Sequence, residues 1–183
     1  MNIIYFILLT LLALFSRTIW HMGANIEFVT TISILGCIIL KDSKLKYLLP
    51  LSIMVVSDMF IGNTAILIFT WSGFLFTPII NRILKEKKNY FKIVGAGLSG
   101  VLLFYLWTNF GVVLVSSMYE KSLMGLLSSY VNALPFLFNQ LATNIISLNA
   151  LYLLVTLYEK YSFEIKGYIK NKTQWLNYHS DRK

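Results

Sequence analysis

Polar side chains lie at one end of several apolar runs in this sequence, where their types could bind a small solute. An arginine, a histidine, an asparagine and a glutamate fall within eleven residues after the first run, and an aspartate ends the third. Polar groups are costly at membrane depth, so we expect them to face protein or water. The candidate solute-binding residues are Arg17, His21, Asn25, Glu27, Asp58, Asn109, Gln140 and Asn144.

The last run carries three of its polar residues at helical spacing. Gln140, Asn144 and Ser147 are separated by four and three positions, which places them on one helix face. The amides then either line a pocket or form hydrogen bonds between helices, as Asn and Gln often do in membranes. Asp58 has similar alternatives, because it could cap loop amides, bond to Asn109 or pair with Arg17. His21 could instead have a structural role and form a hydrogen bond at the membrane–water interface.

The spacings exclude several kinds of catalytic site. No paired histidines have zinc-binding spacing and no Gly-x-Ser-x-Gly segment is present. Glu27 and Asp58 could act as an acid/base pair, but the sequence offers no nucleophile beside them. The glycine-rich segment 95–100 has no lysine after it, which favours a small-residue packing face over a phosphate loop. We therefore expect no enzyme, no metal and no cofactor.

The elements that position these residues are apolar. Hydrophobic residues make up 57% of the 183 positions and charged residues 13%, against roughly 25% charged in soluble proteins. Mean hydropathy is +0.67, which excludes a soluble enzyme and a disordered chain. The pattern predicts six short membrane-spanning helices: 2–15, 28–40, 47–61, 65–83, 91–108 and about 133–158. Pro135 is expected near the start of the last.

The distribution of basic residues predicts the orientation in the membrane. With both termini in the cytoplasm, fourteen of the sixteen Lys and Arg residues lie on the cytoplasmic side, and Arg17 and Lys121 outside. This accounts for the net charge of +8 without a nucleic-acid partner. We expect an all-α protein with several spans in the cell (inner or plasma) membrane. Residues 1–158 would form the transmembrane domain and 159–183 a basic cytoplasmic tail.

Several segments resemble the substrate-binding S components of energy-coupling factor transporters. The chain length, the short spans, the segment 25–30 and the carboxylate at Asp58 carry this resemblance. A closer resemblance is to an uncharacterised family of bacterial integral membrane proteins that looks like those components. The matching motifs are Arg17…His21…Asn25, Ser57-Asp58, Thr108-Asn109-Phe110-Gly111, Tyr119…Leu123-x-Gly125-Leu126 and Tyr130…Ala133-Leu134-Pro135-Phe136.

The resemblance implies a membrane-embedded subunit that binds a small solute for uptake. It also implies a transmembrane and ATPase module as an energising partner, since this sequence encodes no ATPase motif. The alternative is a structural or scaffold membrane protein that transports nothing. A cavity of roughly 300 Å³ or more would favour binding, whereas a dry core with polar residues used between helices would favour a scaffold.

Overall fold

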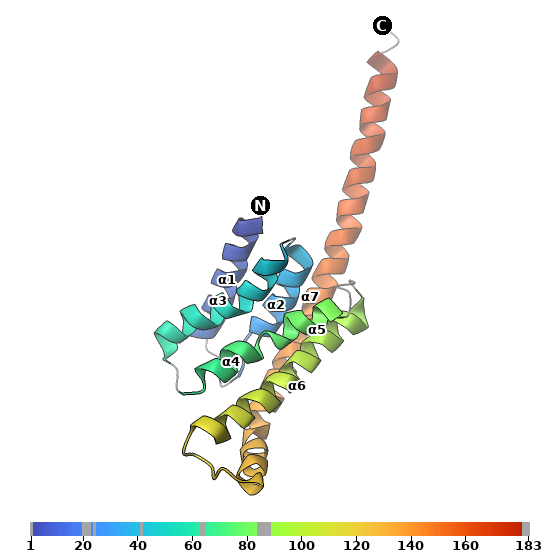
Figure 1. Ribbon diagram of the computed structural model, residues 1–183. Coiled ribbons are helices and arrows are strands. Elements are labelled where there is room, and N and C mark those ends of the chain that lie inside the picture. The colour runs from blue at the N-terminus through green and yellow to red at the C-terminus, as the bar shows by residue number, and fades with distance from the viewer. Residues whose placement is uncertain are drawn as a thin grey trace. The chain divides into compact units, whose positions relative to one another are not determined.

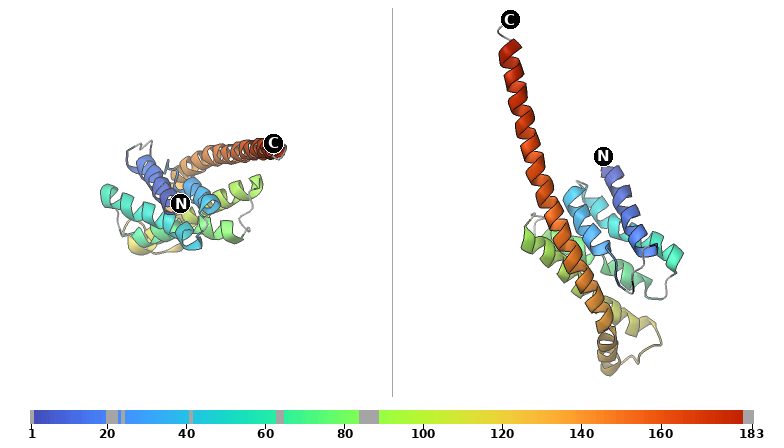
Figure 2. Two further views of the ribbon diagram at one scale, coloured as in Figure 1. Left: turned by 90° about the horizontal axis from the view of Figure 1, so that it is seen from above. Right: turned by 180° about the vertical axis from the view of Figure 1, so that it is seen from behind.

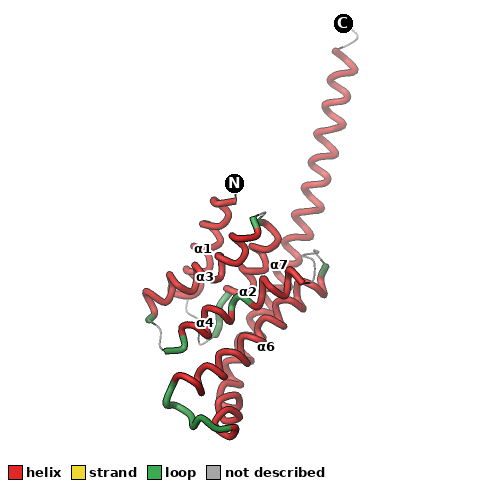
Figure 3. Tube along the Cα trace, in the orientation of Figure 1, coloured by secondary structure: helices red, strands yellow, loops and turns green. Residues whose placement is uncertain are grey.

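The computed structural model is helical throughout the part of the chain that it describes. It describes residues 2–19, 23, 25–40, 42–62, 65–83 and 89–180, and no strand occurs among them. The helices, shown in Figures 1 and 3, are α1 Asn2–Thr18, α2 Val29–Ile39, α3 Ser43–Ile61, α4 Leu67–Gly73, α5 Phe76–Ile83, α6 Tyr90–Val115 and α7 Leu123–Ser180. The expected all-α class is confirmed.

The chain divides into two compact units, residues 1–149 and 150–183. The first unit contains α1 to α6 and the part of α7 up to Asn149. The second unit consists of the rest of α7, which continues as a helix to Ser180. All the site residues discussed below belong to the first unit.

Helix α2 is the central element of the first unit. It packs against α1, α3, α5 and α6, and α1 and α3 also lie side by side (Figures 1 and 2). Most of its residues are buried, including polar Thr30, Thr31 and Ser33 and the thiol of Cys37. The core beside it is built from the side chains Leu9, Ala13, Val29, Ile32, Leu40, Leu49, Ile53, Met54 and Phe74.

Helix ends follow local capping chemistry. The Asp42 carboxylate accepts a hydrogen bond from the Lys44 N–H at 2.8 Å, and the Asn89 side chain accepts one from the Phe91 N–H at 3.0 Å. Helix α3 ends before Gly62, whose φ of 79° lies in the region that glycine tolerates best. These caps explain why α3 and α6 begin slightly before the apolar runs that predicted them.

The fourth expected span is broken into two helices. Helix α4 ends at Gly73, where the absence of a side chain permits close approach to the Phe104 ring. Pro78 lies in the first turn of α5, where its missing N–H removes no helical hydrogen bond. The prediction of one continuous helix over 65–83 is corrected to two helices in sequence, both of which pack against α6.

The last helix begins earlier than predicted. It starts at Leu123 and continues through Pro135, which is therefore inside the helix and not at its first turn. A proline inside a helix costs one backbone hydrogen bond. Two tyrosines join this part of α7 to α6: the Tyr105 hydroxyl donates to the Tyr130 carbonyl at 2.6 Å and the Tyr130 hydroxyl to the Leu106 carbonyl at 3.2 Å. These side-chain bonds support the helix near the proline.

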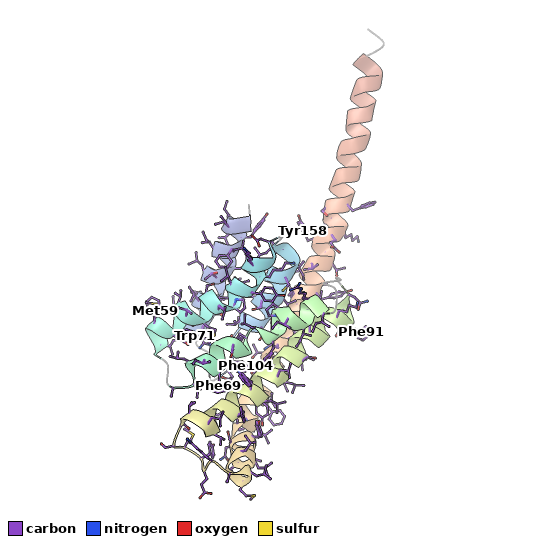
Figure 4. The ribbon with its side chains drawn as sticks, viewed as in Figure 1. Met59, Phe69, Trp71, Phe91, Phe104 and Tyr158 are labelled. Carbon is purple, nitrogen blue, oxygen red and sulfur yellow. The ribbon has the colours of Figure 1, made fainter. Side chains whose placement is uncertain are left out.

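Two helices are long and apolar enough to cross a membrane, one over Tyr90–Val115 and one over Leu123–Phe163. Only 28% and 17% of their most apolar stretches are buried, which distinguishes them from the core helices of a soluble protein. Large apolar side chains are also exposed along α1, including Ile3, Ile4 and Leu8. Figure 4 labels two further exposed side chains, Met59 and Tyr158. Such a surface is unfavourable in water and suits a lipid environment.

Candidate solute-binding cavity

A cavity of about 300 Å³ lies between α6 and the first turns of α7. The loop before α7, the segment around α4 and Asn25 from the loop before α2 complete its walls. Phe104, labelled in Figure 4, is one of the wall residues. The lining residues are Asn25, Ile66, Thr70, Phe104, Tyr105, Thr108, Asn109, Val112, Met118, Tyr119, Ser129, Asn132, Ala133, Phe136 and Gln140.

Helical spacing explains why α6 and α7 each present a continuous wall. On α7, Ser129, Ala133, Phe136 and Gln140 follow one another at intervals of four, three and four residues and so share a face. On α6 the same spacing aligns residues 104, 108 and 112. The Ser129 hydroxyl, which lies within 3.3 Å of both the backbone and side-chain oxygens of Asn109, joins the two walls.

Many polar groups around the cavity already have partners within the protein. The Thr108 hydroxyl donates to the Phe104 carbonyl at 2.8 Å, and the Asn109 amide to the Tyr105 carbonyl at 2.9 Å. The Asn132 amide donates to the Tyr119 hydroxyl at 3.3 Å. Of the two other carboxamides in the lining, Asn25 is exposed, whereas Gln140 is buried and its side chain interacts with the Glu27 carboxylate.

Arg17 and Asp58 form an ion pair beside the cavity without lining it. The guanidinium Nη2 lies 3.0 Å from the Asp58 carboxylate, whose side chain is 4% exposed. The other carboxylate oxygen accepts a hydrogen bond from the Trp71 indole N–H at 2.7 Å. The expected partner of Asp58 is thus Arg17, one of the alternatives the sequence offered. The contact joins the ends of α1 and α3 to α4.

Glu27 lies just before α2 and is almost completely buried. One carboxylate oxygen accepts a hydrogen bond from the Val29 N–H at 2.9 Å, so it satisfies a donor in the first turn of α2. The other oxygen has no hydrogen bond of ordinary geometry among the described residues. Burial raises the pKa of this carboxyl above its usual 4.5, and Arg17, the Val29 N–H and the Gln140 amide oppose that rise by smaller amounts.

Asn144 serves the contact between α2 and α7. Its side-chain oxygen lies 3.4 Å from the Thr31 hydroxyl, which is also 2.6 Å from the Ser147 hydroxyl. The Asn144 amide donates to the Gln140 carbonyl of its own helix. This is the interhelical hydrogen bonding that was the alternative for Asn144, and the residue does not line the cavity.

The structure brings the predicted residues together in two adjacent groups. Asn25, Asn109 and Gln140 line the cavity. Arg17, Glu27 and Asp58 are linked by charge and lie next to it, with Gln140 close enough to Glu27 to affect its pKa. His21 lies outside the described residues.

Sequence reasoning missed Ser129, Asn132 and most of the aromatic wall. The signal was available, because the stripe that contains Gln140 extends back through Phe136 and Ala133 to Ser129. It was overlooked because the last helix was expected to begin at about residue 133. Tyr105 and Phe104 carry no such signal, since they lie within a long apolar run where aromatic residues usually pack against lipid or core.

The predicted small-residue packing face of α6, residues 95–100, is used only in part. A methyl group at Gly95 would meet open space, whereas one at Gly97 would meet Leu148 and one at Gly100 would meet Thr77. Ala96 is fully buried. The small residues of α6 therefore pack against α7 at Gly97 and against α5 at Gly100, whereas Gly95 takes no part in this packing.

Comparison with known proteins identifies a family. The model of a family described as "Family of unknown function (DUF6580)" matches residues 1–166. No curated protein and no solved structure matches the chain.

Proposed function

From the premise that this chain belongs to the DUF6580 family, we propose that it is a multi-pass membrane protein that binds a small solute for uptake. The observation that carries the proposal is the cavity of about 300 Å³, at the lower limit of small-molecule sites. Its wall includes two carboxamides, Asn25 and Gln140.

The membrane topology is part of the proposal. Six spans, with α4 and α5 together forming the fourth, would place both termini in the cytoplasm. The excess of Lys and Arg in segments 41–46, 82–92 and 159–183 supports this orientation. A green fluorescent protein fused after Lys183 should then fluoresce, and alkaline phosphatase at the same place should be inactive. The reverse pattern would refute the orientation.

The proposed role is that of a capture subunit similar to the S components of energy-coupling factor transporters. The support is the resemblance in length, span number and loop motifs. Because no ATP-binding motif occurs in the sequence, uphill transport would need an energising module as partner, or an ion gradient. The proposed location is the inner or plasma membrane of a bacterial cell.

A scaffold that transports nothing is the second candidate. The hydrogen bonds among Thr31, Asn144 and Ser147 favour it, because they use buried polar side chains to join helices. In that case the cavity would be a packing defect, and filling it should leave the function unchanged.

The test is to purify the protein in mild detergent and identify the small molecules and proteins that co-purify by mass spectrometry. Ala133→Leu fills the cavity from its α7 wall, and Ala142→Leu makes the same change at an exposed position of the same helix outside the lining. A solute that is retained by the wild type and by Ala142→Leu but lost from Ala133→Leu supports the proposal. Equal small-molecule content in all three proteins contradicts it.

A further inference from the structure

A buried carboxyl group lies directly behind the wall of the cavity. Glu27 is 6% exposed, and its side chain interacts with that of Gln140, which lines the cavity. One Glu27 oxygen accepts the Val29 N–H at 2.9 Å, whereas the other is buried without a hydrogen bond of ordinary geometry among the described residues. A buried carboxylate with few donors is costly to keep charged. This position therefore favours the protonated acid.

The charged groups on the α1 and α3 side of Glu27 are already paired with each other. Arg17, at the end of α1, bonds to Asp58 of α3 at 3.0 Å, and Trp71 of α4 donates to the other oxygen of Asp58. Burial raises the pKa of Glu27, and the lowering effect of Arg17 is smaller. The guanidinium charge is shared with Asp58, so it does not fully compensate the buried Glu27 carboxylate.

The remaining elements bring no strong acid or base to the lining among the described residues. Tyr105 and Tyr119 are its titratable members, and the Tyr105 hydroxyl donates to a backbone carbonyl of α7 at 2.6 Å. Glu120 and Lys121 of the loop before α7 are exposed and lie outside the lining, and Arg82 of α5 is exposed as well. Glu27 is thus the carboxyl group that Gln140 connects to the cavity.

The chemistry of this position suits a proton better than a metal ion. A metal cation such as Ca²⁺ needs several oxygen ligands, whereas Glu27 has one oxygen that is not hydrogen-bonded within the described part of the chain. The positive charge of Arg17, which acts on Glu27, would also repel a cation. A proton needs a single oxygen and leaves the site neutral.

We propose that Glu27 is a proton-binding site coupled to the cavity, so that a proton and the solute bind together. The proton comes from water, forms an O–H bond on a Glu27 oxygen and returns to water when that bond breaks. This inference rests on the proposed function and names a proton as the second ligand. It would allow a proton gradient to drive uptake.

Gln140 can transmit the protonation state of Glu27 to the cavity. A carboxamide carries an N–H donor and a carbonyl acceptor at the same end. An ionised Glu27 accepts a hydrogen bond from the amide N–H, whereas a protonated Glu27 donates to the amide oxygen. The half of the Gln140 amide that is left for the solute therefore changes from acceptor to donor when Glu27 takes up a proton.

Filling the cavity should strengthen proton binding. A solute or a larger side chain displaces water beside Gln140, which destabilises the charged form of Glu27 more than the neutral form. Because coupling between two ligands is reciprocal, protonation should strengthen solute binding by the same factor. The wild type should therefore hold its solute more tightly in acid than in alkali.

The first test uses the proton alone as the ligand. Infrared difference spectra of the detergent-purified protein follow the C=O stretch of protonated carboxyl groups against pH, and the Glu27 signal is the part that Glu27→Gln lacks. Ala133→Leu fills the cavity and should raise the pH midpoint of this signal by about one unit, whereas Ala142→Leu should not. Equal midpoints in the three proteins, or no Glu27 signal that titrates between about pH 4 and pH 10, would overturn the proposal.

A second variant tests the contact between Glu27 and Gln140. Gln140→Met keeps an unbranched side chain of similar length and removes the amide that stabilises the charged carboxylate. It should raise the Glu27 midpoint, again with Ala142→Leu as the control. An unchanged midpoint would show that Gln140 does not connect Glu27 to the cavity.

The second test uses the solute that co-purifies with the wild type, measured by mass spectrometry after equilibration at a series of pH values. Affinity should fall about tenfold from acid to alkali, since a midpoint shift of one pH unit corresponds to that factor. Glu27→Gln, which is always neutral, should bind equally throughout. Retention by the wild type that is independent of pH, or stronger in alkali, would overturn the proposal. So would loss of the pH dependence from His21→Gln while Glu27→Gln keeps it, because the proton would then belong to the histidine.

This inference and the proposed function can fail separately. If no solute co-purifies but Ala133→Leu raises the Glu27 midpoint, the coupled proton site is supported and the uptake function is contradicted. If a solute co-purifies, is lost from Ala133→Leu and is held equally at every pH, the protein binds a solute without a proton.

Discussion

Arg17 is the residue on which the polar cluster depends, because its positive charge acts on two carboxylates. It bonds directly to Asp58 and acts through space on Glu27. The sequence predicted that Asp58 would need a donor and named Arg17 among the candidates. Trp71 was not anticipated, since a tryptophan in an apolar run gives no sign that its indole N–H will meet a carboxylate.

Replacing Asp58 by alanine should destabilise the protein, because it leaves the half-buried Arg17 charge without its partner. The expected loss is about 3 kcal/mol of unfolding free energy. The double variant Arg17→Met/Asp58→Leu removes both charges and should lose less than Asp58→Ala alone. Thermal unfolding in detergent measures both, and a double variant less stable than Asp58→Ala would contradict the ion-pair explanation.

Glu27 should make stability depend on pH. Its folded pKa is raised above the value of 4.5, so the folded state retains a proton that the unfolded state has lost. Its contribution to stability is present below about pH 4.5 and is lost as pH rises through the folded pKa. Unfolding temperatures of the wild type should fall across that window relative to Glu27→Gln, which has no proton to release. Parallel curves for the two proteins would show that Glu27 does not titrate in this way.

At the scale of the elements, the apolar runs were sufficient to locate every helix. All six predicted runs contain helices, since hydrophobic length is a property that the sequence displays directly. The ends were harder to predict. Helix α7 begins at Leu123 because Ser122 and the tyrosine contacts with α6 support an amphipathic stretch that hydropathy does not mark. The cavity wall from Ser129 to Ala133 was missed for the same reason.

Glycines on α6 allow a test of close helix packing. A methyl group at Gly100 would approach the backbone Cα of Thr77 to 3.3 Å and its side chain still more closely, so α5 would have to move. Gly100→Ala should cost about 1–3 kcal/mol. Gly95→Ala adds the same methyl group in open space and should be neutral or stabilise by up to about 1 kcal/mol. Equal effects in thermal unfolding would show that the α5–α6 contact is not tight.

At the scale of the whole molecule, the family match and the core both exclude the extreme C-terminal residues. The match ends at residue 166, and the core described above lies within residues 1–149. The boundary between the two compact units, after residue 149, does not coincide with the expected domain boundary at 158/159. The expected boundary marks a membrane surface and stays a prediction. Composition predicts the class of such a chain but does not reveal how polar residues from distant segments meet.

A chain shortened to residues 1–166 should keep the stability and the solute binding of the full-length protein. The deletion removes four basic residues, Lys170, Lys172, Arg182 and Lys183, but none that lines the cavity. Its attraction to anionic lipid should fall, because each basic residue near such a surface contributes about 1 kcal/mol. Mass spectrometry of the co-purified solute and flotation with anionic vesicles measure the two properties. A loss of solute affinity would show that the tail takes part in binding.

The rate at which a thiol reagent labels Cys37 can report how often the native helix bundle opens. Cys37 is the single cysteine of the sequence, 3% exposed in the central helix α2. A thiol reagent can therefore modify the native chain only as often as the bundle around α2 opens. The rate of labelling, measured by intact mass in the presence and absence of a solute, reports how strongly an occupied cavity holds the helices together. No mutation, dye or reconstituted transport assay is needed.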